Sequence, residues 1–185
     1  RIMVGIARNH HLHILAEKAA AMGKELPIAV AIGNSASVLV GSQLYLGLGD
    51  DEYDMIGAFL GEPLELARCK SVDLEVPAGA EVILEGSIDA RDLVEEERVS
   101  EFHGFYAVYG PGIGGRIQCM TSRKNPIFQV ILPGFAPEHC LLGAVAIEAV
   151  CCQLLKSVIP SVRRVVVTEG GMGRLHAIIV MHRHC

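Results

Sequence analysis

The sequence predicts an α+β fold with an antiparallel sheet or barrel in its middle. Helix-like segments come first and last, strand-like runs follow one another between them, and no regular alternation of strand and helix indicates a parallel winding. Apolar residues at helical spacing over Leu12–Met22, followed by Gly23, predict the first helix. The apolar stripe of Glu138–Ile159, which follows Pro137, predicts the last helix.

Two shorter helices are predicted in the first third of the chain. Ser35 or Ser37 is positioned to cap a helix that runs to Ser42. Glu52–Leu60 has helical character and ends at Gly61, a residue type that commonly follows a helix. Both segments are therefore expected to lie outside the sheet.

The strands are predicted from short apolar runs that end at glycine, proline or polar turns. Pro27–Ile32 is a continuous apolar run closed by Gly33, which is typical of a buried strand. Ser122–Pro126 is typical of a hairpin connection. The other predicted strands are Leu64–Val76, Val82–Leu84, Phe105–Tyr109, Ile117–Thr121, Ile127–Leu132, and a final pair formed by Arg164–Thr168 and Leu175–Met181.

Composition excludes several classes of protein. Of the 185 residues, 51% are hydrophobic and 20% charged, which favours a buried core over disorder. A formal net charge of −5 with scattered basic residues gives no electrostatic reason to expect nucleic acid or an anionic membrane as partner. The longest apolar run, Leu141–Leu155, is interrupted by Glu148 and Gln153, so we expect no membrane insertion. Six cysteines without a CxxC pair predict reduced, buried thiols and a cytoplasmic protein.

The two ends of the sequence also carry a prediction. The chain opens with Arg1 and stops at Cys185 directly after a strand-like run. We expect these residues to form a single partial domain, 1–185, of a longer protein.

Histidines and glycine-rich loops are the first candidates for chemistry. Gly110–Gly115 and Gly170–Gly173 lack the strand-to-helix context of a phosphate-binding loop and predict turns instead. Three ligands that converge can bind zinc, so a zinc-binding module is one hypothesis. A single functional histidine, either His10 or His11, is the favoured interpretation. The histidine clusters lie near the two ends, at His10, His11 and His13 and at His182, His184 and Cys185.

Carboxylates are the second group of candidates. Glu95–Glu97 and Glu101 lie in one irregular charged segment, for which a solvated acidic loop is the ordinary interpretation. Phe102–Tyr106 follows at once and must be partly buried, so Glu101 is expected beside a hydrophobic wall. A carboxyl group in such a place suits proton transfer near neutral pH, and two carboxylates five residues apart can share a proton.

Several of these segments, taken together, resemble the UbiD-type decarboxylases. Glu52-Tyr53 and Gly57–Leu66 resemble the family stretch written (S)EY…GALRGEPLEL. Cys69 and Asp73–Gly86 resemble C…NDLEVPA…AEIVLEG, and this block is highly specific. Glu96–Tyr106 stands where the family has EGPFGEFTGYY. The resemblance also covers Pro27–Gly33, Arg123–Ile127 and, more loosely, the helix after Pro137, and so includes most of the chain.

The resemblance implies a fold, a reaction and a set of cofactors. Family members are cytosolic enzymes that reversibly decarboxylate aromatic or α,β-unsaturated acids without net oxidation. They use prenylated FMN, supplied by a flavin prenyltransferase and held with manganese (Mn2+) and often potassium (K+). The cofactor domain is a split β-barrel similar to that of flavin reductases, with flanking helices. A homo-oligomer is expected for the full-length form.

The resemblance also implies roles for individual residues. His11, with His10 as its rival, and Glu52 would be metal ligands, and His11 would also lie at the cofactor. Glu101 would donate the proton and Glu96 would be its electrostatic partner. Ser42 and Gln43 stand near the family's serine-rich turn and are candidates for cofactor contact.

The departures from the family pattern lead to two further expectations. The small residues of EGPFGE are replaced by Glu97, Arg98, Val99 and Ser100, which motivates an alternative function as a non-catalytic homologue for assembly or regulation. The family's catalytic arginine, a metal-binding asparagine and a lysine near the phosphate fall outside the 185 residues, so we expect this chain alone to bind prenylated FMN poorly or not at all. Substrate identity is not predicted by the sequence.

Overall fold

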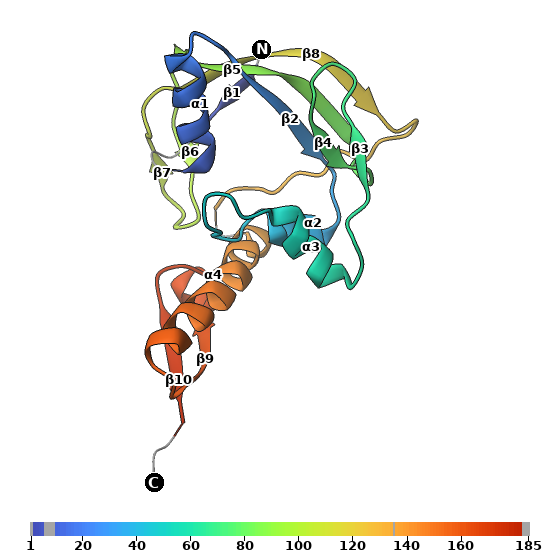
Figure 1. The fold of residues 1–185 in the computed structure, drawn as a ribbon. Coiled ribbons are helices and arrows are strands. Elements are labelled where there is room, and N and C mark those ends of the chain that lie inside the picture. The colour runs from blue at the N-terminus through green and yellow to red at the C-terminus, as the bar shows by residue number, and fades with distance from the viewer. Residues whose placement is uncertain (1, 6–9, 135, 183–185) are drawn as a thin grey trace. The chain divides into compact units, whose positions relative to one another are not determined.

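The computed structural model describes residues 2–5, 10–134 and 136–182, which divide into two compact units (Figure 1). The first unit comprises Arg1–Ser35, Glu65–Val99 and Ala107–Gln129. The second comprises Ala36–Leu64, Ser100–Tyr106 and Val130–Cys185. Each unit is therefore assembled from segments that are far apart in the sequence.

The first unit is built on a four-stranded antiparallel sheet. Its strand order is β1 (Ile2–Val4), β8 (Gly112–Ser122), β5 (Val82–Val94) and β2 (Leu26–Ile32). Helix α1 (His11–Ala21) packs against β5 and β2 (Figure 1). The core between helix and sheet consists of Ala16, Ile28, Ile88 and Ile113, which burial removes from water.

Strands β5 and β8 approach each other unusually closely at Gly86. A Cβ atom on Gly86 would lie 1.9 Å from the carbonyl oxygen of Arg116, a distance that no side chain can adopt. The strand register shifts between Glu85 and Gly86, which marks a bulge at the same point. Glycine is therefore required here by the spacing of the two backbones.

A small hairpin completes the first unit. It consists of β3 (Leu66–Arg68) and β4 (Glu75–Pro77), and its connecting turn is held by the carboxylate of Glu85 on β5. That carboxylate accepts hydrogen bonds from the backbone amides of Lys70 at 3.0 Å and Ser71 at 2.6 Å. Glu85 is only 1% exposed, and the amide of Lys70, followed by that of Ser71, holds the pKa of its carboxyl below the usual value.

Two short helices form one part of the second unit. Helix α2 (Ala36–Gly41) packs against α3 (Glu52–Leu60), and Ile56 of α3, 1% exposed, lies directly on Gly41. Helix α3 begins where the Asp51 side chain accepts a hydrogen bond from the Tyr53 amide at 2.8 Å. It ends at Gly61, whose φ of 75° is in the left-handed region that favours glycine.

A helix and a strand pair form the other part of the second unit. Helix α4 (Pro137–Val158) packs against β9 (Val162–Val167), which pairs antiparallel with β10 (Ala177–Met181). The short 3₁₀ helix η1 (Glu169–Gly171) lies between the two strands. The carboxylate of Glu148 accepts a hydrogen bond from the Val167 amide at 2.7 Å and so ties α4 to the end of β9.

All four predicted helices and the last strand pair are confirmed. The predicted first, second, third and last helices correspond to α1 to α4, and Arg164–Thr168 with Leu175–Met181 corresponds to β9 and β10. The α+β class with antiparallel pairing is confirmed. In the described part of the chain the sheets are open, and none closes into a barrel.

Several strand predictions were wrong. Leu64–Val76 is a hairpin rather than one strand, because Glu85 fixes a turn within it. The predicted turn Gly110–Gly115 overlaps the start of β8, and β5 continues far beyond Leu84. Ile127–Leu132 forms no strand, so Ser122–Pro126 connects no hairpin. Of Phe105–Tyr109 only β7 (Tyr106–Ala107) is a strand, preceded by β6 (Val99–Ser100).

Helix α4 also bears on the expectation of no membrane insertion. By length and composition alone, it is long and apolar enough to cross a membrane. Core helices of soluble proteins can have the same length and apolar composition. Ala146 of α4 is 0% exposed, and Glu148 binds β9, as in a helix that packs on a sheet.

The cysteines are free thiols in the described residues. Cys140 is buried, whereas Cys69, Cys119, Cys151 and Cys152 are half-buried, so the expectation of buried thiols is confirmed for Cys140 and only in part for the other four. Cys185 lies outside the described residues, as does His184 of the predicted end cluster.

Candidate functional site

The segment Ser100–Tyr106 contains Glu101, the predicted proton donor. Backbone hydrogen bonds within the segment fold it into a turn. The amide of Glu101 donates to the carbonyl of Phe105 at 3.0 Å, and the amide of Gly104 donates to the carbonyl of Glu101 at 2.9 Å. Glu101 itself is half-buried, and one carboxylate oxygen accepts a 3.3 Å hydrogen bond from the Phe102 amide. The carboxylate is thus held in a tight turn rather than on an extended acidic loop.

Aromatic and basic side chains gather around Phe102, the residue after Glu101. The guanidinium carbon of Arg174 lies 5.2 Å from the centre of the Phe102 ring. The His139 ring stands edge-on to Phe102 with centroids 6.5 Å apart, and the His103 ring lies 5.2 Å away. We call these four residues, Phe102, His103, His139 and Arg174, the Phe102 cluster. All of them belong to the second unit.

Arg174 is presented to the Phe102 cluster by a tightly packed loop. A Cβ atom on Gly173 would lie 2.4 Å from the carbonyl oxygen of Cys140, so the loop lies directly on α4, and Gly173 has a left-handed φ of 68°. A Cβ atom on Gly143 of α4 would lie 2.8 Å from a terminal nitrogen of Arg174. The guanidinium therefore rests flat on the helix, in space that the missing side chain of Gly143 leaves open.

The two histidines of the Phe102 cluster use the same ring nitrogen to accept a backbone hydrogen bond. Nδ1 of His139 accepts from the Gly134 amide at 3.1 Å, and Nδ1 of His103 accepts from the Phe105 amide at 3.2 Å. A ring nitrogen that accepts carries no proton, so the neutral form of each ring has its proton on Nε2. Each histidine can therefore donate one hydrogen bond from Nε2.

Glu96, the predicted electrostatic partner of Glu101, belongs to the first unit. It is half-buried, and a Cβ atom on Gly5 would lie 3.4 Å from one of its carboxylate oxygens. Its carboxylate therefore lies against the backbone that follows β1. The interpretation of Glu95–Glu97 as a fully solvated loop holds for Glu95 and Glu97, which are exposed, and not for Glu96.

The predicted metal ligands lie at the starts of two helices. His10 is exposed at the N-cap of α1 without a side-chain capping hydrogen bond, and His11 is half-buried as the first residue of that helix. Glu52 is half-buried as the first residue of α3. Among the residues that the structure describes, no hydrogen bond or ion pair engages these three side chains. Within either unit, the described residues contain no group of three or more potential metal ligands.

The predicted cofactor contacts lie just after α2. Ser42 and Gln43 are both exposed, and the Ser42 hydroxyl donates to the carbonyl of Leu39 at 2.8 Å. The packing of Ile56 on Gly41 joins this helix end to α3 and hence to Glu52 within the second unit. Ser42 and Gln43 thus directly follow one helix of a packed pair, and Glu52 begins the other.

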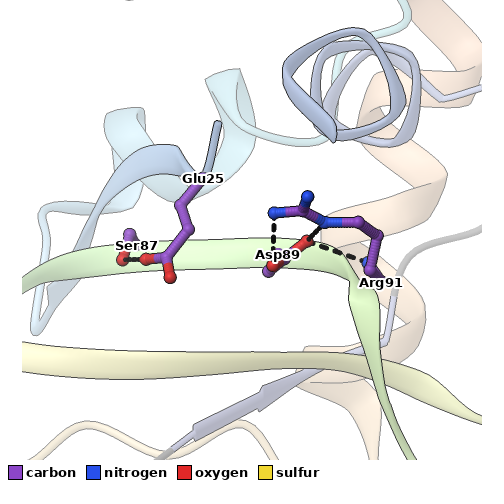
Figure 2. A network of polar contacts seen from close by, with 4 residues as sticks. All are labelled: Glu25, Ser87, Asp89 and Arg91. Atoms are coloured by element: carbon purple, nitrogen blue, oxygen red, sulfur yellow. Dashed lines mark hydrogen bonds and ion pairs between the residues drawn. The ribbon is translucent and has the colours of Figure 1, made fainter. Parts of the chain in front are cut away.

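The first unit has an acidic pocket of about 280 Å³, which sequence reasoning did not find. Figure 2 shows how two of its carboxylates are engaged: Glu25 accepts a hydrogen bond from the Ser87 hydroxyl, and Asp89 accepts two hydrogen bonds of 2.8 Å from the side chain of Arg91. The hydrogen bonds from Arg91 lower the pKa of the Asp89 carboxyl. Because its own neighbours satisfy these groups, the pocket has the character of a structural polar network.

Comparison with known proteins decides the family. Residues 1–136 match the model of the UbiD 3-octaprenyl-4-hydroxybenzoate carboxy-lyase Rift-related domain, which is well over half of the chain. The chain belongs to the UbiD family of carboxy-lyases. The family resemblance of the sequence motifs is thereby confirmed.

Relatives of this UbiD-family chain are named as decarboxylases. It is 36% identical over 170 residues to an anhydromevalonate phosphate decarboxylase of Methanothermobacter thermautotrophicus, which is 91% of the chain and 40% of the relative. It is 36% identical over 142 residues to a phenolic acid decarboxylase of Sedimentibacter hydroxybenzoicus, covering 72% of the chain and 28% of the relative. The chain thus spans 28–40% of the length of these two relatives.

A solved structure matches the UbiD-family chain over nearly its whole length. An evolved dimeric form of the UbiD-class enzyme HmfF from Pelotomaculum thermopropionicum, in complex with prenylated FMN (prFMN), is 37% identical with a TM-score of 0.91. The match covers 97% of this chain and 42% of HmfF. The mixed helix and strand architecture is therefore that of a UbiD-class enzyme.

The Phe102 cluster was not predicted from the sequence. Gly170–Gly173 was interpreted only as a turn, and Arg174 next to it was not considered, although the turn presents it. His139 was passed over as part of the last helix. An arginine directly after a glycine turn is the one signal in the sequence that could have pointed to this cluster.

Proposed function

We propose that this UbiD-family protein reversibly decarboxylates an aromatic or α,β-unsaturated carboxylic acid, with prenylated FMN as cofactor. The observation that carries the proposal is the likeness of 97% of the chain to HmfF in complex with prFMN, with a TM-score of 0.91. Relatives named as phenolic acid, pyrrole-2-carboxylic acid and ferulic acid decarboxylases support the same class of substrate.

Glu101 is the proposed proton donor to the carbon that has lost carbon dioxide. The turn of Ser100–Tyr106 restrains its backbone, and Phe102 beside it provides an apolar ring. A general acid must be held at a fixed position within reach of the carbon that it protonates, and the restrained turn suits Glu101 to this step. Glu96, half-buried against Gly5, is the proposed electrostatic partner.

The donor atoms of the predicted ligands suit the proposed cofactor and metal. An imidazole from His11 or its rival His10, together with the carboxylate of Glu52, is a donor set that manganese accepts beside a phosphate, and potassium is a further proposed ion. Ser42 and Gln43 are exposed and available for cofactor contact. Prenylated FMN, when bound, supplies the electron sink for the negative charge left by carbon dioxide.

The remaining parts of the proposal concern the whole protein. Because the chain spans 28–40% of the length of the two decarboxylases, the activity is proposed for the full-length protein. A split β-barrel around the flavin, a homo-oligomer, a cytoplasmic location and a flavin prenyltransferase as cofactor supplier are all proposed on the strength of the family.

One experiment tests the proposed function. The full-length protein is produced together with a flavin prenyltransferase, its flavin spectrum is recorded, and carbon dioxide release is measured with a panel of aromatic and unsaturated acids. We expect Glu101→Gln to retain bound flavin and to lose 10²-fold or more in turnover. Glu62→Gln, an exposed carboxylate in the same unit, is the matched control and should not change turnover.

The outcomes separate the enzyme from the alternative. A flavin-loaded Glu101→Gln variant with undiminished turnover contradicts the role of Glu101. Flavin binding without turnover of any acid by the unsubstituted protein favours the non-catalytic homologue that the replacements at Glu97–Ser100 suggest. Zinc at one per chain, measured by elemental analysis, favours the zinc-binding module instead, whereas manganese favours the enzyme.

A further inference from the structure

We propose that Arg174, supported by the histidines of the Phe102 cluster, binds an anionic group at the non-reacting end of the substrate. The substrate would then be an aromatic or unsaturated acid that carries a second carboxylate or a phosphate. This inference rests on the proposed function, because it places the substrate next to Glu101.

The charge of Arg174 lacks a partner in the part of the chain that the structure describes. Its Nε atom is buried without a hydrogen-bond partner, and no described carboxylate lies within ion-pair distance of its guanidinium. Arginine remains charged at any physiological pH. A buried donor without a partner on a permanent cation is costly. Because the Nε atom is closed to solvent, the rest of the half-buried guanidinium is the part that an anion would reach.

The guanidinium is held in place before any ligand arrives. Gly173 packs its loop on the carbonyl of Cys140, and the space left by Gly143 receives the guanidinium. The amide of Arg174 also donates to the carbonyl of Gly171 at 3.0 Å, so the backbone on both sides is fixed. A preorganised planar fork binds a carboxylate or a phosphate with two parallel hydrogen bonds and little loss of side-chain freedom.

The rest of the Phe102 cluster suits the body of such a ligand. The Phe102 ring, already in contact with the guanidinium, offers a flat apolar surface to an aromatic or unsaturated acid. His139 and His103 each retain an Nε2 donor, since their Nδ1 atoms accept backbone hydrogen bonds. The cluster therefore combines one cation, two imidazole Nε2 donors and an apolar ring.

The reacting carboxylate is not the group that Arg174 is expected to bind. Carbon dioxide leaves as a neutral molecule, so tight ion pairing of the departing carboxylate would stabilise the ground state and oppose the reaction. Binding of a remote anionic group has the opposite effect, because it fixes the substrate without holding back the reacting end. Arg174 is therefore proposed as a determinant of specificity and not as a catalytic residue.

Binding measurements test the inference without turnover. The full-length protein is titrated by calorimetry with benzoate, benzene-1,4-dicarboxylate and 4-phosphonooxybenzoate at constant ionic strength. We expect at least one of the two doubly anionic probes to bind about tenfold or more tightly than benzoate. The choice between them identifies the second group as carboxylate or phosphate.

Variants assign that preference to Arg174. Arg174→Met should reduce the preference to about twofold or less, and Arg174→Lys, which keeps the charge but not the fork, should retain only part of it. Arg163→Met, an exposed arginine on β9 of the same unit, is the matched control and should retain all of it. If Arg174→Met fails to fold, Arg174→Gln replaces it, with far-UV circular dichroism as the check.

Two results would overturn the inference: no preference for either doubly anionic probe, or a preference that survives in Arg174→Met and Arg174→Gln. Because these experiments measure binding, their failure differs from failure of the proposed function, which would appear as absent turnover in the unsubstituted protein. Retained turnover with lost discrimination between singly and doubly anionic acids in Arg174→Met supports both.

Discussion

The contact between Gly41 and Ile56 predicts a strongly non-additive pair of substitutions. Ile56 is 1% exposed, so Ile56→Ala removes a fully buried side chain and should destabilise the protein by about 2–5 kcal/mol. A methyl group on Gly41 would lie 2.2 Å from Cγ1 and 2.8 Å from Cδ1 of Ile56, so Gly41→Ala overpacks the contact and should cost about 1–3 kcal/mol.

The double variant Gly41→Ala/Ile56→Ala tests whether the two substitutions act through the same contact or destabilise the protein independently. In the Ile56→Ala background the atoms that the new methyl group would strike are gone, and the methyl group fills part of the cavity. Alanine also favours a helix over glycine by about 1 kcal/mol. Gly41→Ala should therefore be neutral or stabilising in that background, with a coupling energy of about 1–3 kcal/mol between the two sites.

Urea denaturation followed by circular dichroism measures the four free energies of unfolding. Gly170→Ala, at an exposed glycine with no atom near its would-be Cβ, is the control and should change stability by less than about 0.5 kcal/mol. Equal costs of Gly41→Ala in both backgrounds would refute the described packing of α2 on α3. The result bears on the proposed function because Ser42 directly follows α2 and Glu52 begins α3.

Three further predictions follow from single contacts. Gly86→Ala should destabilise the first unit by more than about 3 kcal/mol in a urea titration, because its methyl group would strike the Arg116 carbonyl, whereas Gly79→Ala, with open space around it, should not. The pKa of the Glu85 carboxyl is lower in the folded protein than in the unfolded chain. The carboxylate therefore stabilises the fold fully above the pKa of the unfolded chain, and this stabilisation is lost as the pH falls through the pKa of the folded protein. Hydrogen exchange at Lys70 and Ser71, corrected for the intrinsic rate, should therefore increase on acidification, and Glu85→Gln should remove this pH dependence. Burial, followed by the charge of Glu85, raises the pKa of the Cys69 thiol. Iodoacetamide should therefore alkylate Cys69 more slowly than free cysteine at pH 7.5, as measured by mass spectrometry. Equal alkylation rates would contradict the burial of Cys69.

Helix boundaries could be predicted from the sequence because local chemistry determines them. Helix α3 runs over Glu52–Leu60 as predicted, since Asp51 caps its first turn and Gly61 adopts the left-handed conformation after its last. Pro137 begins α4 for the same kind of reason. In each case the deciding residue is within a few positions of the boundary.

Strand boundaries depended on distant partners and were predicted less well. The charged residues after Leu84 interrupted the apolar pattern of β5, yet Glu85 is buried because the turn at Lys70 and Ser71 supplies its hydrogen bonds. Conversely, Ile127–Leu132 is apolar but forms no ladder, and the amide of Ile127 donates to the Glu81 carboxylate at 3.2 Å instead. The sequence contains these residue types but not the pairing that gives them their structure.

The same limit applies to the candidate site. Glu101 and Glu96 could be proposed from their spacing and from the family motif, because both lie in one short segment. The Phe102 cluster unites residues from three parts of the chain, near positions 102, 139 and 174, and only tertiary packing brings them together. Residues that belong to no local sequence pattern cannot be assigned to a site from the sequence alone.

The structure also weighs on the choice between an enzyme and a non-catalytic homologue. The alternative arose because Glu97–Ser100 replaces the small residues of the family loop, which could have left Glu101 without a fixed backbone. Instead, Ser100 ends β6, its hydroxyl donates to the carbonyl of Pro133 at 3.4 Å, and the Glu101 amide binds the Phe105 carbonyl. These contacts restrain the segment and anchor it to the stretch whose Gly134 amide donates to His139. The substituted loop therefore still holds the backbone of Glu101 by hydrogen bonds, directly before the Phe102 ring on which Arg174 lies.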